Sequence, residues 1–426
     1  MKAAPGLRLV EAPAAAPETA SPLVRRLRVG LYGGHLLTAW ALGISNGLLG
    51  LCLVAAPWLG SARLPASRAA RRALTAAAAY LLLLVGAVAA SRAPLQSLGG
   101  LSEIVGFATF ALAMLWIRGE RRVRWLIDAL ILVGAVVALS GLAQVLLGYG
   151  GIERRIRGPF SHYMTFAGTL LLLDLMLIAR MLLRRERSPG QGPTAWLDRP
   201  LVAWSALGIV NLALIVSLTR SAWLALVAAL VGIVALVRPR LLVWAPVLAA
   251  LFLIVAPVPV VERVLSITHL AEDSNYDRIA MAEAGARMVE ERPLLGVGPE
   301  MVKRLYPIYR HPTAPRLLTP HLHNSYVQIA AERGLPALGV YLALLAFAFA
   351  AAWRGYRRGR FERNGRADMH LGAIAALLGF SIAALFENNW GDTEVQRLVL
   401  FLLAVPFCLE AADDAAAGAG SARTAA

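Results

Sequence analysis

A short segment near residue 323 holds side chains that could move protons and attract anions. His321 and His323 come directly before Asn324 and Ser325, either of which suits the N-cap of a helix that ends at Gly334. His323 would then stand at the N-terminus of this helix, where free backbone N–H groups favour an anion. A histidine placed there could accept a proton from an attacking hydroxyl group, or it could simply cap a helix at the membrane interface.

Arginine 278 lies in a segment with a helical pattern. Residues 274–277 have the capping-box pattern, so we predict a helix over 275–291. On helical spacing, Arg278 shares an otherwise apolar face with Met281, so it needs a buried anionic partner or a path by which its charge reaches water. Arg287, in contrast, has three glutamates as helical neighbours and is typical of a solvated ion-pair residue.

Two further arginines lie at the ends of apolar runs. Arg220 occupies a very short turn between two such runs, and Arg157 stands just before His162 at the start of another. An ionisable residue at membrane depth is a site hypothesis by default, although each of these could also contact lipid headgroups. Together with Arg278 and His323, they suit a lipid-linked phosphate or pyrophosphate, and the substrates would be amphiphiles.

Composition places these residues in a membrane protein. The chain has 426 residues, of which 58% are hydrophobic and 16% charged, and its mean hydropathy is +0.63. Soluble domains hold about 25% charged residues, so these values exclude a soluble enzyme. The sequence has no Walker loop, nucleophile elbow or HExxH pattern, and its two cysteines, Cys52 and Cys408, lie in apolar runs. We therefore expect no metal, nucleotide or other cofactor, and no nucleic acid partner.

Twelve apolar runs could cross a bilayer, which takes about 20 residues each. The first two runs could form one overlong helix, but counting them as two places most arginine-rich loops on the cytoplasmic side, as the positive-inside rule requires. Most of the net charge of +16 then orients the helices, and both termini are cytoplasmic. The predicted spans are 29–44, 45–60, 72–90, 98–117, 123–148, 162–183, 199–217, 219–237, 241–259, 335–353, 370–387 and 394–411.

The predicted fold is an all-α polytopic membrane protein with about 12 transmembrane helices and one long outer loop, which contains short helices, between spans 9 and 10. Long loops cross the membrane whatever their charge, so the arginines of this loop do not contradict the topology. The predicted parts are a cytoplasmic tail (1–28), helices 1–9 (29–259), the outer loop with catalytic residues (260–324), a short interfacial helix with helices 10–12 (325–411), and a disordered cytoplasmic tail (412–426).

The combination of these motifs resembles the bacterial O-antigen ligase/polymerase superfamily. The likeness rests on Ser217–Trp223, Asn275–Arg278, Pro293–Gly298 and His323-Asn324. The ligase pattern of His, Asn, nine residues and then Gly is met by His323, Asn324 and Gly334. After two further residues, Leu335 and Pro336, the pattern has Gly, Thr or Tyr, whereas this chain has Ala337.

The resemblance implies a glycosyltransferase-C-like fold and a metal-independent, inverting reaction. In it, a glycan passes from undecaprenyl pyrophosphate to lipid A–core oligosaccharide during lipopolysaccharide biosynthesis, at the periplasmic face of the Gram-negative inner membrane. Mapped residue by residue, the essential histidine of the family falls on His323 and its two arginines on Arg220 and Arg278. Four further candidates are Arg157 for the pyrophosphate and, as secondary site residues, Asn324, His321 and His162.

Other functions stay open at this point. An O-antigen polymerase or an O-linked protein oligosaccharyltransferase of the same superfamily would use the same donor with another acceptor. A transporter or flippase for lipid-linked sugars would also suit twelve spans, but it should show related halves and charged residues near the midplane. Here the candidates cluster on one side, which favours an enzyme.

Overall fold

The computed structural model describes residues 20–59, 67–183, 195–267, 273–362 and 365–424, with the side chains of 273 and 411–424 left out. Over these residues the secondary structure is helical and contains no strand, which confirms the all-α prediction. The α-helices are α1 (Pro22–Leu37), α2 (Leu42–Leu59), α3 (Arg68–Ala89), α4 (Pro94–Ser97), α5 (Ser102–Trp116), α6 (Glu120–Ala143), α7 (Tyr163–Leu182), α8 (Pro200–Val216), α9 (Arg220–Val237), α10 (Ala245–Val255), α11 (Val258–Leu265), α12 (Asp273–Glu291), α13 (Val302–Tyr309), α14 (Ser325–Glu362), α15 (Ala367–Ala383) and α16 (Thr393–Thr424). The 3₁₀ helices among the described residues are η1 (Leu98–Leu101), η2 (Gln144–Leu147), η4 (Ala195–Asp198) and η5 (Pro239–Trp244).

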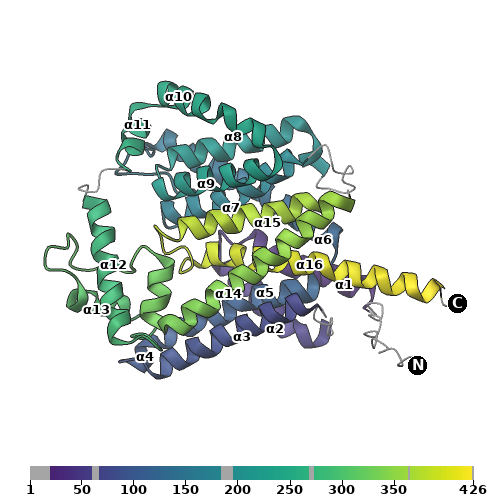
Figure 1. The fold of residues 1–426 in the computed structure, drawn as a ribbon, viewed down its shortest axis with the longest axis horizontal. Coiled ribbons are helices and arrows are strands. Elements are labelled where there is room, and N and C mark those ends of the chain that lie inside the picture. Colours follow the sequence, from purple (N-terminus) through teal and green to yellow (C-terminus); the bar gives the residue numbers. More distant parts are fainter. Residues whose placement is uncertain (1–19, 60–66, 184–194, 268–272, 363–364, 425–426) are drawn as a thin grey trace, which may run out of the picture.

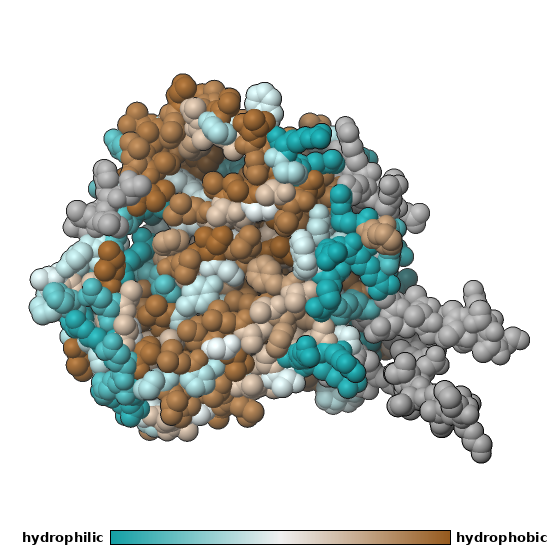
Figure 2. Space-filling model, in the orientation of Figure 1, coloured by the Kyte–Doolittle hydropathy of each residue, from teal (hydrophilic) through white to brown (hydrophobic). Residues whose placement is uncertain are grey.

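Most of these helices form a bundle suited to a bilayer. In the described part of the chain, 7 helices are long and apolar enough to span a membrane, and three apolar segments are shorter: Pro200–Val216, Pro239–Val255 and Ala367–Ala383. This fits a polytopic membrane protein, while the count of twelve spans stays a prediction. Figure 2 shows apolar side chains over much of the bundle surface and hydrophilic ones gathered toward its two ends. At one of these ends lie α12 and α13, and α16 extends from the other (Figure 1).

The first two apolar runs are separate helices. α1 ends at Leu37 and α2 begins at Leu42, so the structure has two helices where the sequence allowed one or two. The backbone N–H of Thr38 and of Ala41 donates to the carbonyls of Gly34 and Thr38, which closes α1 with tight turns. Two helices rather than one agree with the topology that the charge distribution favours.

Several predicted helix boundaries differ from the structure. The expected span 241–259 is interrupted after Val255, because Pro257 has no N–H and Ala256 before it is extended (ψ 141°). α10 itself has 11 residues, about 16 Å, roughly half of the hydrocarbon core. At the other end, α16 continues as a helix to Thr424, in a segment rich in alanine, the strongest helix former. The disorder expected for 412–426 stays a prediction, and 425–426 lie outside the described residues.

The predicted outer loop contains α12 and α13, which pack against α14. α12 confirms the helix expected over 275–291, and α13 is a second, shorter one. A separate hydrophobic core joins them to α14 through Met281, Ala284, Met288, Val297, Met301, Val302, Leu305, Tyr306, Leu322 and Ala331. This core fixes α12, and with it Arg278, against the start of α14.

Gly334 breaks α14 where the sequence predicts a helix stop. Its φ of 84° is readily adopted by glycine and is strained for other residues. A Cβ at this position would lie 2.1 Å from the carbonyl oxygen of Leu294. The turn after α12 docks on this break, with Val297 N donating to Ala331 O at 2.8 Å and Leu335 N to Pro293 O at 2.7 Å. The break therefore separates a short helical segment, which begins beside His323, from the long helix that follows.

Candidate functional site

His323 lies in a bend that is held by the residue after it. Asn324 caps α14, because its Oδ1 accepts from Tyr326 N and Val327 N, both at 3.0 Å. Its Nδ2 donates to Leu385 O at 3.0 Å and so fastens the cap to the loop between α15 and α16. This confirms the N-cap expected at Asn324 or Ser325 and gives Asn324 a structural part in the site. His323 itself has a φ of 49°, a left-handed conformation that is rare for residues other than glycine.

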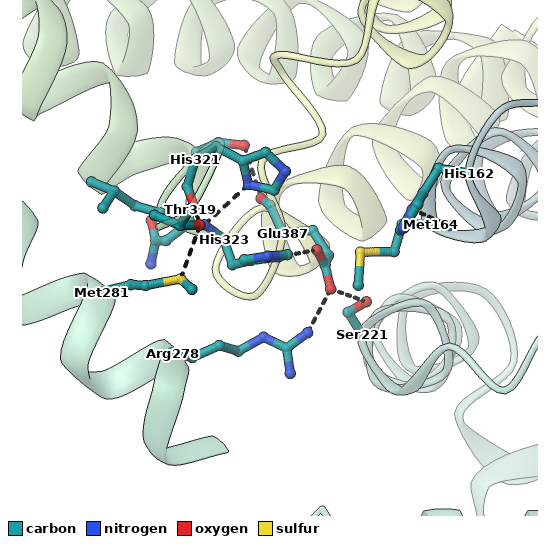
Figure 3. Close-up of polar contacts among 12 residues, drawn as sticks. His162, Met164, Ser221, Arg278, Met281, Thr319, His321, His323 and Glu387 are labelled. Carbon is teal, nitrogen blue, oxygen red and sulfur yellow. Dashed lines mark hydrogen bonds and ion pairs between the residues drawn. The ribbon is translucent and has the colours of Figure 1, made fainter. Parts of the chain in front are cut away.

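The imidazole of His323 contacts a buried carboxylate. Nδ1 of His323 lies 2.9 Å from Oε2 of Glu387, whose side chain is 4% exposed. Arg278 donates to Oε1 of the same carboxylate at 2.7 Å, and Ser221 Oγ lies 3.5 Å from that oxygen. Figure 3 shows Arg278, His323 and Ser221 converging on Glu387 from three different elements. Glu387 is thus the centre of the cluster.

The contacts of Glu387 explain how a buried carboxyl group stays charged. Burial by itself would raise the pKa of Glu387, but the hydrogen bond from His323 and the positive charge of Arg278 outweigh it, so the pKa lies below its ordinary value. Ser221 is the second residue of α9, so the positive end of that helix also faces the carboxylate. An ionised Glu387 accepts the Nδ1 proton of His323, which leaves Nε2 with a lone pair that can accept a proton.

Arg278 has the buried anionic partner that its apolar helix face requires. It projects from α12, whose Met281, Ala284 and Met288 are buried in the core beside it. Glu387, 109 residues away in the sequence, supplies the negative charge. The Nε of Arg278 is buried and makes no hydrogen bond within the part of the chain that the structure describes. The guanidinium therefore keeps donor capacity beyond the Glu387 contact.

Arg220 opens α9 and is 6% exposed. It binds the segment that leads into α12: its guanidinium donates to Ser266 O and Oγ at 2.9 Å, to Ser274 Oγ at 2.6 Å and to Asn275 Oδ1 at 3.0 Å. The predicted capping box would place Ser274 before the helix, whereas α12 already begins at Asp273. The Ser274 hydroxyl accepts a hydrogen bond from Arg220. Arg220 thus ties α9 to the helix that carries Arg278, and its neighbour Ser221 contacts Glu387.

Comparison with known families supports the resemblance that the motifs carry. Residues 203–342 match the family model described as O-Antigen ligase. This match supports membership of the O-antigen ligase superfamily. No curated protein matches the chain. The matched segment contains Arg220, Ser221, Arg278 and His323, whereas Glu387 lies outside it. The superfamily suggests a membrane enzyme of glycosyltransferase type.

His321, which lies two residues before the motif histidine His323, packs on its ring. The rings of His321 and His323 lie 4.3 Å apart between centroids, and Nδ1 of His321 accepts from the backbone N–H of His323 at 3.4 Å. Burial and the neighbouring His323 lower the pKa of His321 to about 4, so His321 is neutral near pH 7. Among the described residues, no group of three or more His, Cys, Asp and Glu side chains could hold a metal ion.

The predicted candidates before α7 lie at the edge of the cluster. His162 caps α7 by accepting from Met164 N at 3.2 Å. Its pKa is lowered, chiefly by burial and also by the charges of His323, Arg155 and Arg157, while Glu387 acts in the opposite direction. Arg157 donates to Ser161 O at 2.9 Å, within its own loop. His162 therefore interacts electrostatically with Glu387 and His323, and Arg157 adds positive charge near His162.

Glu387 is the functional candidate that sequence reasoning missed. The predicted span 370–387 ends at Glu387, whereas α15 ends at Ala383 and Glu387 lies in the loop before α16. The available signal was an acidic residue at the outer end of an apolar run, which is a site hypothesis by the same rule that selects Arg220. The loop is anchored beside His323, since Ser325 N donates to Ala384 O at 2.8 Å and Ser325 Oγ to Glu387 O at 3.0 Å.

Proposed function

We propose that this protein is an O-antigen ligase. It transfers a glycan from undecaprenyl pyrophosphate to lipid A–core oligosaccharide at the periplasmic face of the Gram-negative inner membrane, as a step of lipopolysaccharide biosynthesis. The observation that carries the proposal is the carboxylate of Glu387, which binds His323 at 2.9 Å and Arg278 at 2.7 Å. A proton acceptor and a cation for a departing phosphate thus lie side by side, and both belong to the segment that matches the ligase family.

The reaction needs a base for the acceptor hydroxyl. His323 Nε2 takes the hydroxyl proton as the acceptor oxygen attacks the anomeric carbon, and Glu387 stabilises the imidazolium that forms. The new bond joins the acceptor oxygen to the anomeric carbon. The bond from that carbon to the phosphate oxygen breaks, and its electron pair leaves with the pyrophosphate. One displacement of this kind inverts the anomeric centre.

The leaving pyrophosphate needs positive charge. Arg278 shares the Glu387 carboxylate with His323 and binds the departing group through the donors that Glu387 does not use, while Arg220 and Arg157 add positive charge around it. Arg220 also holds the start of α12, so it fixes the position of Arg278. The energy for transfer lies in the glycosyl phosphate bond, so the mechanism requires neither a nucleotide nor a metal.

The proposal is tested by replacing the base. His323→Ala should lower the transfer rate by about 10²–10⁴-fold, the usual contribution of a general base, while the protein still purifies from the membrane. His311→Ala is the matched control, because His311 lies in the same outer region and its Nδ1 contacts Thr313 Oγ1 at 2.7 Å, away from Glu387. Transfer at the wild-type rate by His323→Ala would refute the proposed role of this residue.

The acceptor is tested in the same assay. Purified protein with an undecaprenyl-pyrophosphate glycan is offered lipid A–core, a second donor molecule or a pilin-type protein in parallel. The ligase proposal expects a product with lipid A–core alone. Elongation of the donor glycan would identify a polymerase, and glycosylation of the pilin would identify a protein oligosaccharyltransferase.

A further inference from the structure

A cavity of about 420 Å³ lies at the end of α3 and α14 that is opposite to the His323 site. Figure 1 shows α12 and α13 at one end of the bundle and the end of α16 at the other. The lining residue Glu410 belongs to α16. The lining residues are Ser67, Arg68, Ala69, Arg72, Arg354, Arg358 and Glu410. Four arginines against one glutamate give the lining three excess positive charges.

The arginines reach the cavity in pairs from two packed helices. Arg68 and Arg72 are one turn apart at the start of α3, and Arg354 and Arg358 are one turn apart near the end of α14. The positive-inside rule favours arginine at this end of the helices, but it does not require four guanidinium groups to face one cavity. Like charges brought together repel one another, so an anion in the cavity would offset a real cost.

The contacts within the cavity indicate which arginines are suited to an anion. Arg358 Nε donates to Glu362 at 2.7 Å, and Glu410 accepts from Ser67 Oγ at 3.0 Å. The side chains of Arg68, Arg72 and Arg354 are exposed at the cavity. Their planar guanidinium groups match the oxygens of a phosphate better than an ammonium would.

Aromatic residues beside the cavity mark the level of the lipid headgroups. Trp353 directly precedes Arg354, is 38% exposed, and its ring lies 5.8 Å from the ring of Tyr356. Tryptophan and tyrosine gather where a membrane meets water, and the apolar helix Ser325–Glu362 ends in the same region. Basic pockets between helices at this level are suited to anionic headgroups. We propose that Arg68, Arg72 and Arg354 bind the phosphodiester headgroup of an anionic membrane phospholipid in this cavity.

Lipid binding by the purified full-length protein tests the proposal. Phosphatidylglycerol is titrated into the detergent-solubilised protein and the bound lipid is counted by native mass spectrometry. The pair Arg72→Gln with Arg354→Gln should weaken binding about 30-fold, which corresponds to about 1 kcal/mol for each arginine. The matched control is Arg71→Gln with Arg357→Gln, which removes two exposed arginines from the same helices outside the cavity lining. We expect this control to change the affinity by less than about threefold.

Further measurements distinguish a phospholipid headgroup from free phosphate as the bound anion. Phosphatidylcholine should bind at least about tenfold more weakly than phosphatidylglycerol, because its headgroup has no net charge. Inorganic phosphate at millimolar concentration should fail to displace the lipid. Equal losses in the two double variants would overturn the proposal in favour of diffuse surface charge, and displacement by inorganic phosphate would overturn the lipid assignment. The variants alter exposed side chains, so size-exclusion profiles and melting temperatures like those of the wild type are expected to confirm that they fold.

Discussion

Replacement of Glu387 by glutamine tests the chemistry of the site most directly. The carboxylate accepts from two donors, His323 Nδ1 at 2.9 Å and Arg278 at 2.7 Å, on separate oxygens. A glutamine amide has the same shape but one acceptor oxygen and one NH₂ donor, so it can satisfy only one of the two. The hydrogen bond from the charged Arg278 is the stronger of the two, so we expect the amide oxygen to face Arg278.

The cost of this substitution follows from the tautomer that it selects. With the NH₂ group facing Nδ1, the ring of His323 must accept there, and its proton moves to Nε2, the atom that should act as the base. The wrong tautomer in a comparable histidine–carboxylate pair lowers kcat about 10⁴-fold, and we expect a loss of that order here. If the amide oxygen faced His323 instead, the loss of one charged hydrogen bond, about 1.5–3 kcal/mol, would reduce the rate by roughly 10–200-fold.

The assay is single-turnover transfer from an undecaprenyl-pyrophosphate glycan to lipid A–core, measured by gel for purified variants. Asp392→Asn is the matched control, because it makes the same change of carboxylate to amide at the end of the same loop, where Asp392 contacts Thr165 at 3.1 Å. The double variant of Glu387→Gln and His323→Ala should be no slower than His323→Ala alone, since Glu387 acts through His323. A single-turnover rate for Glu387→Gln within about threefold of the wild type, or multiplication of the two losses in the double variant, would refute this reasoning.

Three further predictions concern the surroundings of the site. Arg220→Lys should lower transfer at least about tenfold, because an ammonium cannot reproduce the fork that binds Ser266, Ser274 and Asn275 together, and initial rates test this. Gly334→Ala should destabilise the protein by about 3 kcal/mol or more, because φ at this position is 84° and the methyl group would overlap Leu294 O. The measurement is the melting temperature, which should fall for Gly334→Ala. It should not fall for the control Gly339→Ala, whose methyl group would meet no atom within 4 Å. Burial raises the pKa of Asp392 to about 7, so the folded state binds its proton more tightly than the unfolded state, and this contribution to stability is lost as the pH rises from about 4 to 7. Asp392→Asn should therefore raise the melting temperature relative to the wild type above pH 7, and the two melting temperatures should become equal near pH 4. A higher melting temperature of the variant at acidic pH alone would contradict the raised pKa of Asp392.

Local sequence determines much of the site because its signals act over a few residues. The N-cap at Asn324, the helix of α12 and the break at Gly334 are all predicted and all observed, since capping, helical periodicity and glycine at positive φ depend on neighbours along the chain. The need of Arg278 for a buried anion also follows from its helix face. The sequence alone leads to the O-antigen ligase superfamily, which the family model supports.

Tertiary packing decides which residues become the partners of His323, Arg278 and Arg220. Glu387 meets His323 across 64 residues and Arg278 across 109, and no spacing rule relates positions so far apart in the chain. Packing likewise turns Arg220 toward Ser274, where it holds the start of α12, so that only one of the two expected arginines shares the carboxylate with the histidine. The sequence predicts His323 as the base and predicts that Arg278 needs a counterion. The packing of α12 and of the loop before α16 against α14 selects Glu387 as that counterion, because an ion pair between distant segments forms only where the fold brings them within about 4 Å.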